Sequence, residues 1–363
     1  MTYDNVLKND ERAVLSLRSL YKAYGYQPFK MSKFEEYDLY ALNKDFLVSD
    51  RVITFTDTDG RLLALKPDVT LSIIKSSNDT SGKRKVYYDE NVYRISPRSG
   101  QFSEIMQTGI ECIGDIDVND IYETIYLAAE SLSEISESFV LDISHMGVVN
   151  SILTDAGCSD SQKKEITRLI SERNLHELEA FCCSGGISDE YRKSISKLAE
   201  TYGDRATVIS ELEKICRTVG SVSALNELKT LDKLLSGYKD GEKVRFDFSI
   251  VNNMNYYNGI VFKGFVNGIS ESVLSGGEYA KLLSNMGIRG NGIGFALYLD
   301  RLDELDVNSE KYDVDVVIVY SDETSPEYLL SQKQEYVSMG LSVAAYKSEP
   351  PAKIIYKQLV ELD

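Results

Sequence analysis

The chain has 363 residues, of which 43% are hydrophobic and 27% are charged, which is the balance of a folded globular protein rather than a disordered or fibrous one. Its formal charge of -17 argues against nucleic acid as a partner, because nucleic-acid binders gather lysine and arginine into a basic surface. No stretch reaches the apolar length of a membrane span and the first ten residues are not signal-like, so we expect a cytoplasmic protein without a membrane partner.

The first part of the chain is predicted to form a helix followed by paired strands. Apolar residues recur at helical spacing from Asp10 to Tyr24, and Gly25 follows where a left-handed cap is expected. Beyond it, the pattern predicts a hairpin at 52–65, a short helix at 67–74, an antiparallel pair of strands at 85–94 and 104–114, a helix at 121–133 and a strand at 139–143.

The remainder is predicted to contain a helical insertion and a small appendage. Helical periodicity dominates from about 145 to 241, after which the pattern predicts strands at 244–251 and 256–265, a turn at Gly276–Gly277, and a helix or strand-helix unit at 292–305. After a polar, acidic connector, an apolar run opens a βαβα segment at 314–363. We therefore expect an α/β (α+β) protein with one domain at 1–305, which includes the insertion, and a second at 314–363.

The cysteine and histidine content gives no sign of a metal site. The five cysteines are scattered and form no CxxC pair, so we expect reduced thiols that are mostly buried. Only two histidines are present, and neither has a cysteine at the spacing of zinc ligands.

Polar residues on one strand face suggest a ligand site. In a strand at 104–114, Gln107, Gly109 and Glu111 share one face while Met106, Ile110 and Cys112 share the other. The preceding strand adds Arg94. Burying these polar and charged groups without partners would cost folding free energy. They therefore either pair with one another, as in an Arg94–Glu111 ion pair, or bind a small ligand that carries both charge types. The hairpin alone does not decide between these alternatives.

Segments spread over residues 10–305 together resemble the class II aminoacyl-tRNA synthetase fold of the histidyl type, an antiparallel sheet flanked by helices. They are Arg12 to Glu35 (motif 1), Phe55 to Thr70 (the amino-group segment), Tyr88 to Gly114 (motif 2), Asn255 to Phe262 (the histidine-specific signature) and Gly294 to Leu302 (motif 3). The signature is the most specific of these segments, and it points to histidine as the ligand.

The resemblance implies a role for individual residues of this chain. Asp68 and Thr70 would hold the amino group of histidine, Gln107 would lie near its backbone, and Glu111 with Tyr257 would recognise the ring. This set suits imidazole, which has one donor and one acceptor when neutral. The candidate histidine-binding residues are Asp68, Thr70, Arg94, Gln107, Glu111, Tyr256, Tyr257 and Tyr279.

Departures from the synthetase pattern affect the chemistry of amino-acid activation, which needs positive charge around ATP. Asn252 stands in the place of the signature arginine, and Ser96, Gln101 and Ser103 stand where the motif 2 arm carries charged groups. Arg94 and Arg301 remain, and Arg301 is a candidate vestigial phosphate site, although structural ion pairs are the favoured explanation for both. Lys66 or Lys263 is a candidate replacement for the missing carboxylate partner.

A synthetase-like body that keeps the histidine pocket and lacks the ATP and tRNA functions resembles the regulatory subunits of ATP phosphoribosyltransferase. That resemblance implies a non-catalytic protein, without cofactor, metal or tRNA. Its partner would be a short-form catalytic subunit in the first step of histidine biosynthesis, with histidine as the feedback ligand and a homodimer within a hetero-octamer as the assembly. The alternatives are a divergent histidyl-tRNA synthetase or other amino-acid adenylating enzyme, and a scaffold that binds no ligand.

Overall fold

The computed structural model describes residues 7–47, 51–77, 82–95, 100–251, 256–305 and 312–362. The chain divides into two compact units, Met1–Leu305 and Asp306–Asp363. Within the described ranges, no helix has the length and apolar character needed to cross a membrane.

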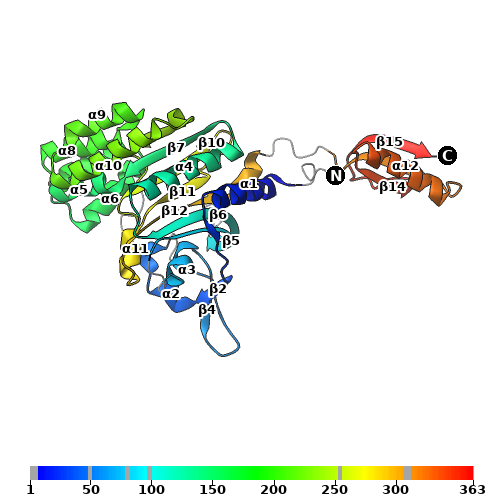
Figure 1. Ribbon diagram of the computed structural model, residues 1–363, viewed down its shortest axis with the longest axis horizontal. Helices are drawn as coiled ribbons and strands as arrows, with labels where there is room; N and C mark the ends of the chain where they lie inside the picture. Colours follow the sequence, from blue (N-terminus) through cyan, green and yellow to red (C-terminus); the bar gives the residue numbers. More distant parts are fainter. Residues whose placement is uncertain are drawn as a thin grey trace. The chain divides into compact units, whose positions relative to one another are not determined.

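The first unit is built on a nine-stranded sheet with the order β1-β5-β6-β12-β11-β10-β7-β9-β8 (Figure 1). Its strands are β1 (Gln27–Pro28), β5 (Arg84–Ile95), β6 (Phe102–Gly114), β7 (Phe139–His145), β8 (Tyr202–Gly203), β9 (Val244–Asp247), β10 (Ile260–Val266), β11 (Leu274–Glu278) and β12 (Asn291–Tyr298). Neighbours are antiparallel except for β1 with β5 and β7 with β9. The predicted antiparallel pairing of β5 with β6 is confirmed.

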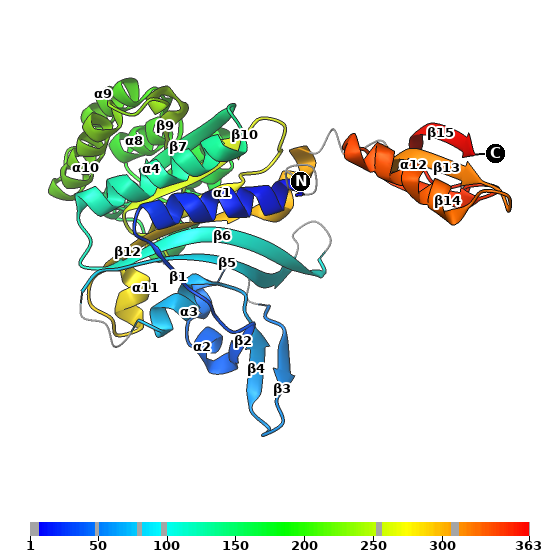
Figure 2. The same cartoon turned by 45° about the vertical axis from the view of Figure 1, so that its right-hand side comes forward.

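Helices cover both faces of this sheet (Figure 2). Helices α1 (Asn9–Ala23) and α4 (Val118–Ile135) lie on one face, and the helix predicted at 10–24 is therefore confirmed as α1. The short helices α2 (Tyr37–Ala41), α3 (Thr70–Lys75) and α11 (Ala280–Asn285) lie on the other face.

Strand alternation gives each sheet face its own hydrophobic core. Ile110 and Cys112 of β6 join the core beneath α1 and α4. Ile113, which lies one residue beyond Cys112, joins the second core with residues of α3 and α11. Gln107 and Glu111 share the face of Ile113, as the period of two predicts. This second face holds the site described below.

A small antiparallel sheet extends from the second face. It has the order β2-β4-β3, from β2 (Phe34–Glu36), β4 (Leu62–Leu65) and β3 (Thr54–Thr56), and it includes the predicted hairpin. The chain passes from β4 directly to α3 through 66–69, so the hairpin places the residues around Asp68 against the main sheet.

The predicted helical insertion is present between β7 and β9. It comprises α5 (Met146–Asp155), α6 (Asp160–Ser171), α7 (Leu175–Ser184), α8 (Asp189–Ala199), α9 (Arg205–Ile215) and α10 (Val219–Leu235), with the two-residue strand β8 between α8 and α9. The apolar residues Ile166, Leu169 and Ile170, which repeat at helical spacing, are all fully buried.

Two local predictions in the first unit are wrong. The predicted strand at 256–265 begins later, because Tyr256 and Tyr257 precede β10. Gly276 and Gly277 do not form a turn but lie inside β11, paired on both sides. A side chain at either glycine would collide with a neighbouring residue, so the glycines serve close packing rather than a change of direction.

The segment at 292–305 is strand β12 followed by the 3-10 segment Leu299–Leu305, the second of the predicted alternatives.

The second unit is a three-stranded parallel sheet with one helix. Its elements are β13 (Val314–Tyr320), α12 (Pro326–Ser338), β14 (Val343–Lys347) and β15 (Tyr356–Leu362), and the sheet order is β14-β13-β15. The predicted terminal helix of the βαβα pattern is wrong, because 356–362 pairs in parallel with β13 as a strand. The small core contains Val316, Ile318 and Leu362.

Candidate ligand pocket

A cavity of about 530 Å³ lies on the second face of the main sheet. It is lined by every sequence candidate, namely Asp68, Thr70, Arg94, Gln107, Glu111, Tyr256, Tyr257, Tyr279 and Arg301. These residues come from the segment before α3 and its first residue, from β5 and β6, from the turn before β10, from the residue before α11 and from the 3-10 segment after β12. The fold therefore gathers residues that are up to 233 positions apart into one concave site.

Glu111 is held at the floor of this pocket by two hydroxyl groups. Thr70 Oγ1 donates to Glu111 Oε1 at 2.6 Å, and the hydroxyl of Tyr279 donates to Glu111 Oε2. Only 2% of Glu111 is exposed. This burial raises the pKa of its carboxyl to about 8, while the hydrogen bonds from Thr70 and Tyr279 oppose the shift. This carboxyl therefore keeps its proton to a higher pH than a solvent-exposed glutamate does.

Arg94 is paired with Asp68 rather than with Glu111. Its Nη2 lies 3.6 Å from Asp68 Oδ2, and its Nε donates to the backbone oxygen of Pro67 at 2.6 Å. Asp68 also accepts from the backbone N–H of Leu71 at 3.0 Å. Burial raises the pKa of Asp68, and the charge of Arg94 opposes this shift. The Arg94–Glu111 ion pair considered from the sequence is thus wrong, and Glu111 keeps no cationic partner among the described residues.

Gln107 carries an unused hydrogen-bond donor in the pocket. Its side chain is 1% exposed, and its Nε2 has no hydrogen-bond partner within the described ranges. Leaving a buried amide N–H unpaired costs about 1–3 kcal/mol, and most buried polar groups avoid that cost. An acceptor on a bound molecule, such as a carboxylate oxygen, would satisfy it.

Aromatic rings form one wall of the cavity. The rings of Tyr256 and Tyr257 lie 4.5 Å apart, and Tyr256 is 6.1 Å from Tyr279. A Cβ at Gly277 would lie 2.7 Å from the ring of Tyr257, so this glycine gives the ring its place against β11. Rings placed in this way can enclose the flat face of a small ring system.

A glycine also makes room for Glu111. A Cβ at Gly294 of β12 would lie 2.0 Å from Glu111 Oε2 and 2.4 Å from the backbone oxygen of Ile110. Gly294 faces Glu111 directly in the β12–β6 register. The absence of a side chain at this position therefore allows the carboxylate to lie flat against the sheet.

The cationic side chains that could meet a phosphate or a carboxylate of a ligand either have protein partners or do not line the cavity. Arg301 donates to the backbone oxygen of Ser272, lies 3.1 Å from Glu271, and packs over the ring of Tyr298. Lys66 is fully buried against Glu90 at 2.8 Å and does not line the cavity. Burial lowers the pKa of Lys263, which lies outside the cavity lining. Asn252 and Ser96 lie outside the described residues.

The two histidines differ in their surroundings. His145 accepts from the backbone N–H of Gly147 at the start of α5, and its Nε2 lies 3.0 Å from Glu227. His176 is exposed. Among the described residues, no group of three or more His, Cys, Asp or Glu side chains could hold a metal ion.

Several lining residues were not anticipated from the sequence. They include Phe46, Tyr88, Ser275 and Tyr298. Tyr88 could have been found, because the hairpin register places it opposite Gly109, on the face of Gln107 and Glu111. Phe46 comes from a short 3-10 segment far from any motif, and no sequence pattern marks it.

Comparison with known proteins agrees with this architecture. The histidyl-tRNA synthetase family profile matches residues 4–302. The chain is 28% identical over 293 residues to the ATP phosphoribosyltransferase regulatory subunit of Oceanobacillus iheyensis, covering 80% of this chain and 72% of that one. It is also 28% identical over 295 residues to the protein of the same name from Clostridium acetobutylicum, covering 79% and 72%.

Solved structures extend the likeness over most of the chain. A protein from Bacillus halodurans, described as an ATP phosphoribosyltransferase regulatory subunit/histidyl-tRNA synthetase, superposes with a TM-score of 0.79 at 25% identity, covering 97% of this chain and 93% of that one. Histidyl-tRNA synthetase from Nostoc shares the fold, with a TM-score of 0.71 at 18% identity over 94% of this chain and 83% of that one. The chain therefore belongs to the histidyl-tRNA synthetase family, and among its members it is of the ATP phosphoribosyltransferase regulatory subunit kind.

Proposed function

We propose that this chain activates a short-form ATP phosphoribosyltransferase catalytic subunit and makes the complex sensitive to histidine in the first step of histidine biosynthesis. The relatives named as regulatory subunits support the assignment. A solved complex from Thermotoga maritima, described as ATP phosphoribosyl transferase (HisG:HisZ), shares the fold at 22% identity with a TM-score of 0.63, over 80% of this chain and 97% of that one.

The observation that carries the ligand assignment is the pairing of an unused donor with a buried carboxyl in one cavity. Gln107 Nε2 would donate to the carboxylate of histidine, and Glu111 would accept from a ring N–H. Asp68 would face the ammonium group, and the tyrosine wall would enclose the ring. Each group of the ligand then meets a group of opposite hydrogen-bonding or charge character.

Feedback follows from differential affinity. Histidine can inhibit the complex only if it binds the less active arrangement more tightly than the active one. The chain itself performs no chemical step, so its effect reaches the catalytic subunit through their contact. We propose that two copies of the chain form the dimer around which the larger hetero-octamer is built.

The test is reconstitution with the catalytic subunit encoded by the same organism. Adding the chain should raise phosphoribosyltransferase activity, and histidine should lower the activity of the complex. Glu111→Gln should weaken the histidine response while leaving the activation, whereas Gln334→Met, at an exposed glutamine of α12, should change neither. Absence of activation by the wild-type chain would contradict the proposal.

Calorimetric titration of the chain with histidine separates a histidine sensor from a scaffold, because a scaffold that binds no ligand gives no saturable heat.

A further inference from the structure

The edge strands of the protein differ in the length of backbone that they offer to a strand of another molecule. The main sheet ends in β1 and β8, which have two residues each, and the small antiparallel sheet ends in β2 and β3, which have three each. Such short edges leave little room for a further strand. The parallel sheet of the second unit ends in β14, with five residues, and in β15, with seven. Strand β15 is therefore the longest edge strand in the described part of the chain.

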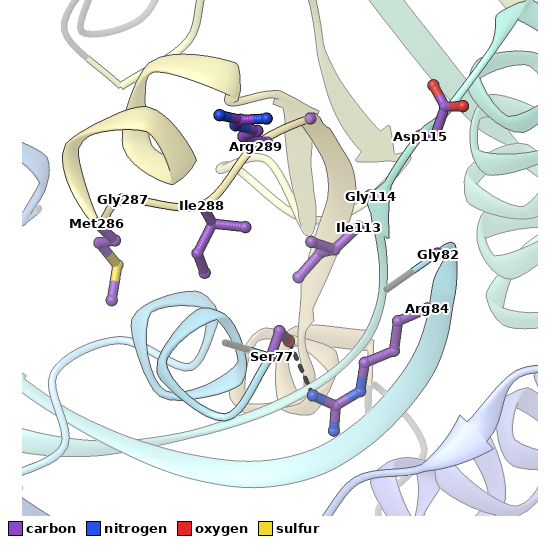
Figure 3. Close-up of a pocket in the computed structure, with 11 residues that line it drawn as sticks. Ser77, Gly82, Arg84, Ile113, Gly114, Asp115, Met286, Gly287, Ile288 and Arg289 are labelled. Carbon is purple, nitrogen blue, oxygen red and sulfur yellow. Dashed lines mark hydrogen bonds between the residues drawn. The ribbon is translucent and has the colours of Figure 1, made fainter. Parts of the chain in front are cut away.

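Strand β5 extends beyond its short neighbour β1, but other contacts protect the part that β1 leaves uncovered. The backbone N–H of Tyr93 donates to the backbone oxygen of Lys66 at 2.9 Å, so the segment before α3 covers the second half of β5. At the start of β5, the side chain of Arg84 points toward Ser77 and donates to its hydroxyl at 2.8 Å (Figure 3). A charged side chain at an edge disfavours the addition of a strand.

Strand β15 lacks the features that usually protect an edge. It contains no proline, and it pairs with β13 without interruption from Gln358 to Leu362. Lys357, Gln358, Leu359 and Glu361 are exposed, and 41% of Leu359 is accessible. An edge strand of this length presents backbone N–H and C=O groups on its outer side, which can pair with a further strand.

The sequence of β15 is complementary to itself when two copies run antiparallel. If Leu359 of one copy lies opposite Leu359 of the other, Lys357 lies opposite Glu361 and Glu361 lies opposite Lys357. Residues directly opposite each other have Cβ atoms about 4.5–5.5 Å apart, so both pairs join opposite charges. A parallel pairing in the same register would place like charges together. An antiparallel pairing shifted by one residue would place Lys357 opposite Val360.

The charged residues of β15 lie on the face that is free of the small core. Val360 packs against that core, so Lys357, Leu359 and Glu361 lie on the other face of the strand. Lys357 is 2.7 Å from Asp315, and Glu361 makes no ion pair among the described residues. Pairing of two copies would give Glu361 a cationic partner. Because exposed ion pairs contribute little free energy, backbone hydrogen bonds would hold the strands together and the charges would select the register.

We propose that two copies of the chain associate through β15, which pairs antiparallel with β15 of the other copy about a two-fold axis at Leu359. The two three-stranded sheets then form one continuous sheet. Both copies use the same surface, so the contact closes at two copies and does not propagate. No residue of the histidine pocket takes part in it.

The test is disulfide cross-linking of the full chain through a cysteine placed at the axis. Leu359→Cys, combined with Cys183→Ser to remove the exposed native cysteine, should form a disulfide-linked dimer under mild oxidation. The reason is that opposite Cα atoms lie about 4.5–5.5 Å apart, within the range of a disulfide. Non-reducing gels of samples at low micromolar concentration measure the yield.

Gln358→Cys in the same background is the matched control. Gln358 is exposed like Leu359, but in the proposed register the two copies of this residue are offset by two positions, which is about 7 Å along the strand. Their Cα atoms are then too far apart for a disulfide, so the yield of linked dimer should be several-fold lower.

Reversal of charge tests the register. Adding Glu361→Lys to Leu359→Cys should slow cross-linking several-fold, because lysines then face each other. Glu323→Lys, at an exposed glutamate outside β15, changes the net charge equally and should leave the rate unchanged. Adding Lys357→Glu to Glu361→Lys should restore the cross-linking.

The proposal is overturned if Leu359→Cys and Gln358→Cys cross-link equally, if neither cross-links, or if Glu361→Lys and Glu323→Lys have the same effect. Preferential cross-linking of Leu359→Cys to an added catalytic subunit would also overturn it, because the edge would then belong to that partner. The assay of the chain by itself contains neither histidine nor a catalytic subunit, so its failure is distinguishable from failure of the proposed function.

Discussion

Tyr279 donates a hydrogen bond to Glu111 although the two residues lie 168 positions apart in the chain. Tyr279 immediately precedes α11, and Glu111 lies in β6. The other carboxylate oxygen of Glu111 is held by Thr70, the first residue of α3. The starts of two helices therefore fix the orientation of one buried carboxyl, which is the arrangement that a selective binding site needs.

The first prediction concerns pH. Because the pKa of Glu111 is raised from 4.5 to about 8, the folded protein binds this proton more tightly than the unfolded chain. The resulting stabilisation is fully present below pH 4.5 and is lost as pH rises through about 8. The wild type should therefore lose stability relative to Glu111→Gln as the pH rises from 4.5 to about 8. The difference between their free energies of unfolding should decrease by up to about 1.4 kcal/mol per pH unit over this range. Urea unfolding of both proteins at several pH values measures this difference, and parallel curves would contradict the pKa shift.

The second prediction concerns the unused donor of Gln107. Gln107→Met replaces an unpaired buried amide with an apolar side chain of similar length, so the stability of the ligand-free protein should stay the same or rise. The affinity for histidine should fall by about tenfold, because one hydrogen bond to the ligand is lost. Thermal unfolding and calorimetry on the same samples give both values. A loss of stability without a loss of affinity would assign Gln107 a structural role instead.

The third prediction concerns Gly294. Gly294→Ala places a methyl group 2.0 Å from Glu111 Oε2 and 2.4 Å from a backbone oxygen, so the strand or the carboxyl must shift. We expect a destabilisation of about 1–3 kcal/mol and the loss of histidine binding. Gly237→Ala is the matched control, because a Cβ there has no neighbour within 4 Å. Equal effects of the two substitutions on histidine affinity would show that the clash is relieved without moving Glu111.

The fourth prediction concerns catalysis. Activation of an amino acid requires positive groups that are free to meet ATP, whereas Arg301 is engaged by Ser272 and Glu271, and Arg94 by Asp68 and Pro67. The chain should show no histidine-dependent exchange of pyrophosphate into ATP. A histidyl-tRNA synthetase assayed in parallel is the positive control, and exchange by this chain above the enzyme-free blank would refute the assignment as a non-catalytic subunit.

Local sequence patterns predicted the parts of the fold that depend on short-range contacts. The period of two in β6 assigned Gln107 and Glu111 to one face and Ile110 and Cys112 to the other, and the structure agrees. Helix α1 and the β5–β6 hairpin were also found, because amphipathic spacing reports which side of an element is buried. The candidate pocket residues came from ordered motifs, and all of them line one cavity.

Predictions failed where distant segments decide the structure. The segment 356–362 is rich in residues that also favour helices, but pairing with β13 makes it a strand, because tertiary contacts override weak local propensity. Gly276 and Gly277 resemble a turn in sequence, yet they lie inside β11, where neighbouring residues leave no space for a Cβ.

The sequence by itself therefore determined which candidate residues line one pocket, the face of β6 on which Gln107 and Glu111 lie, and the synthetase-like order of the elements. Only the tertiary structure decided that Arg94 pairs with Asp68, that Tyr279 and Thr70 hold Glu111, and that Gln107 keeps an unused donor. The physical reason is that a face is set by the local period of a strand, whereas a hydrogen-bond partner is set by which distant segment the folded chain brings within about 3 Å.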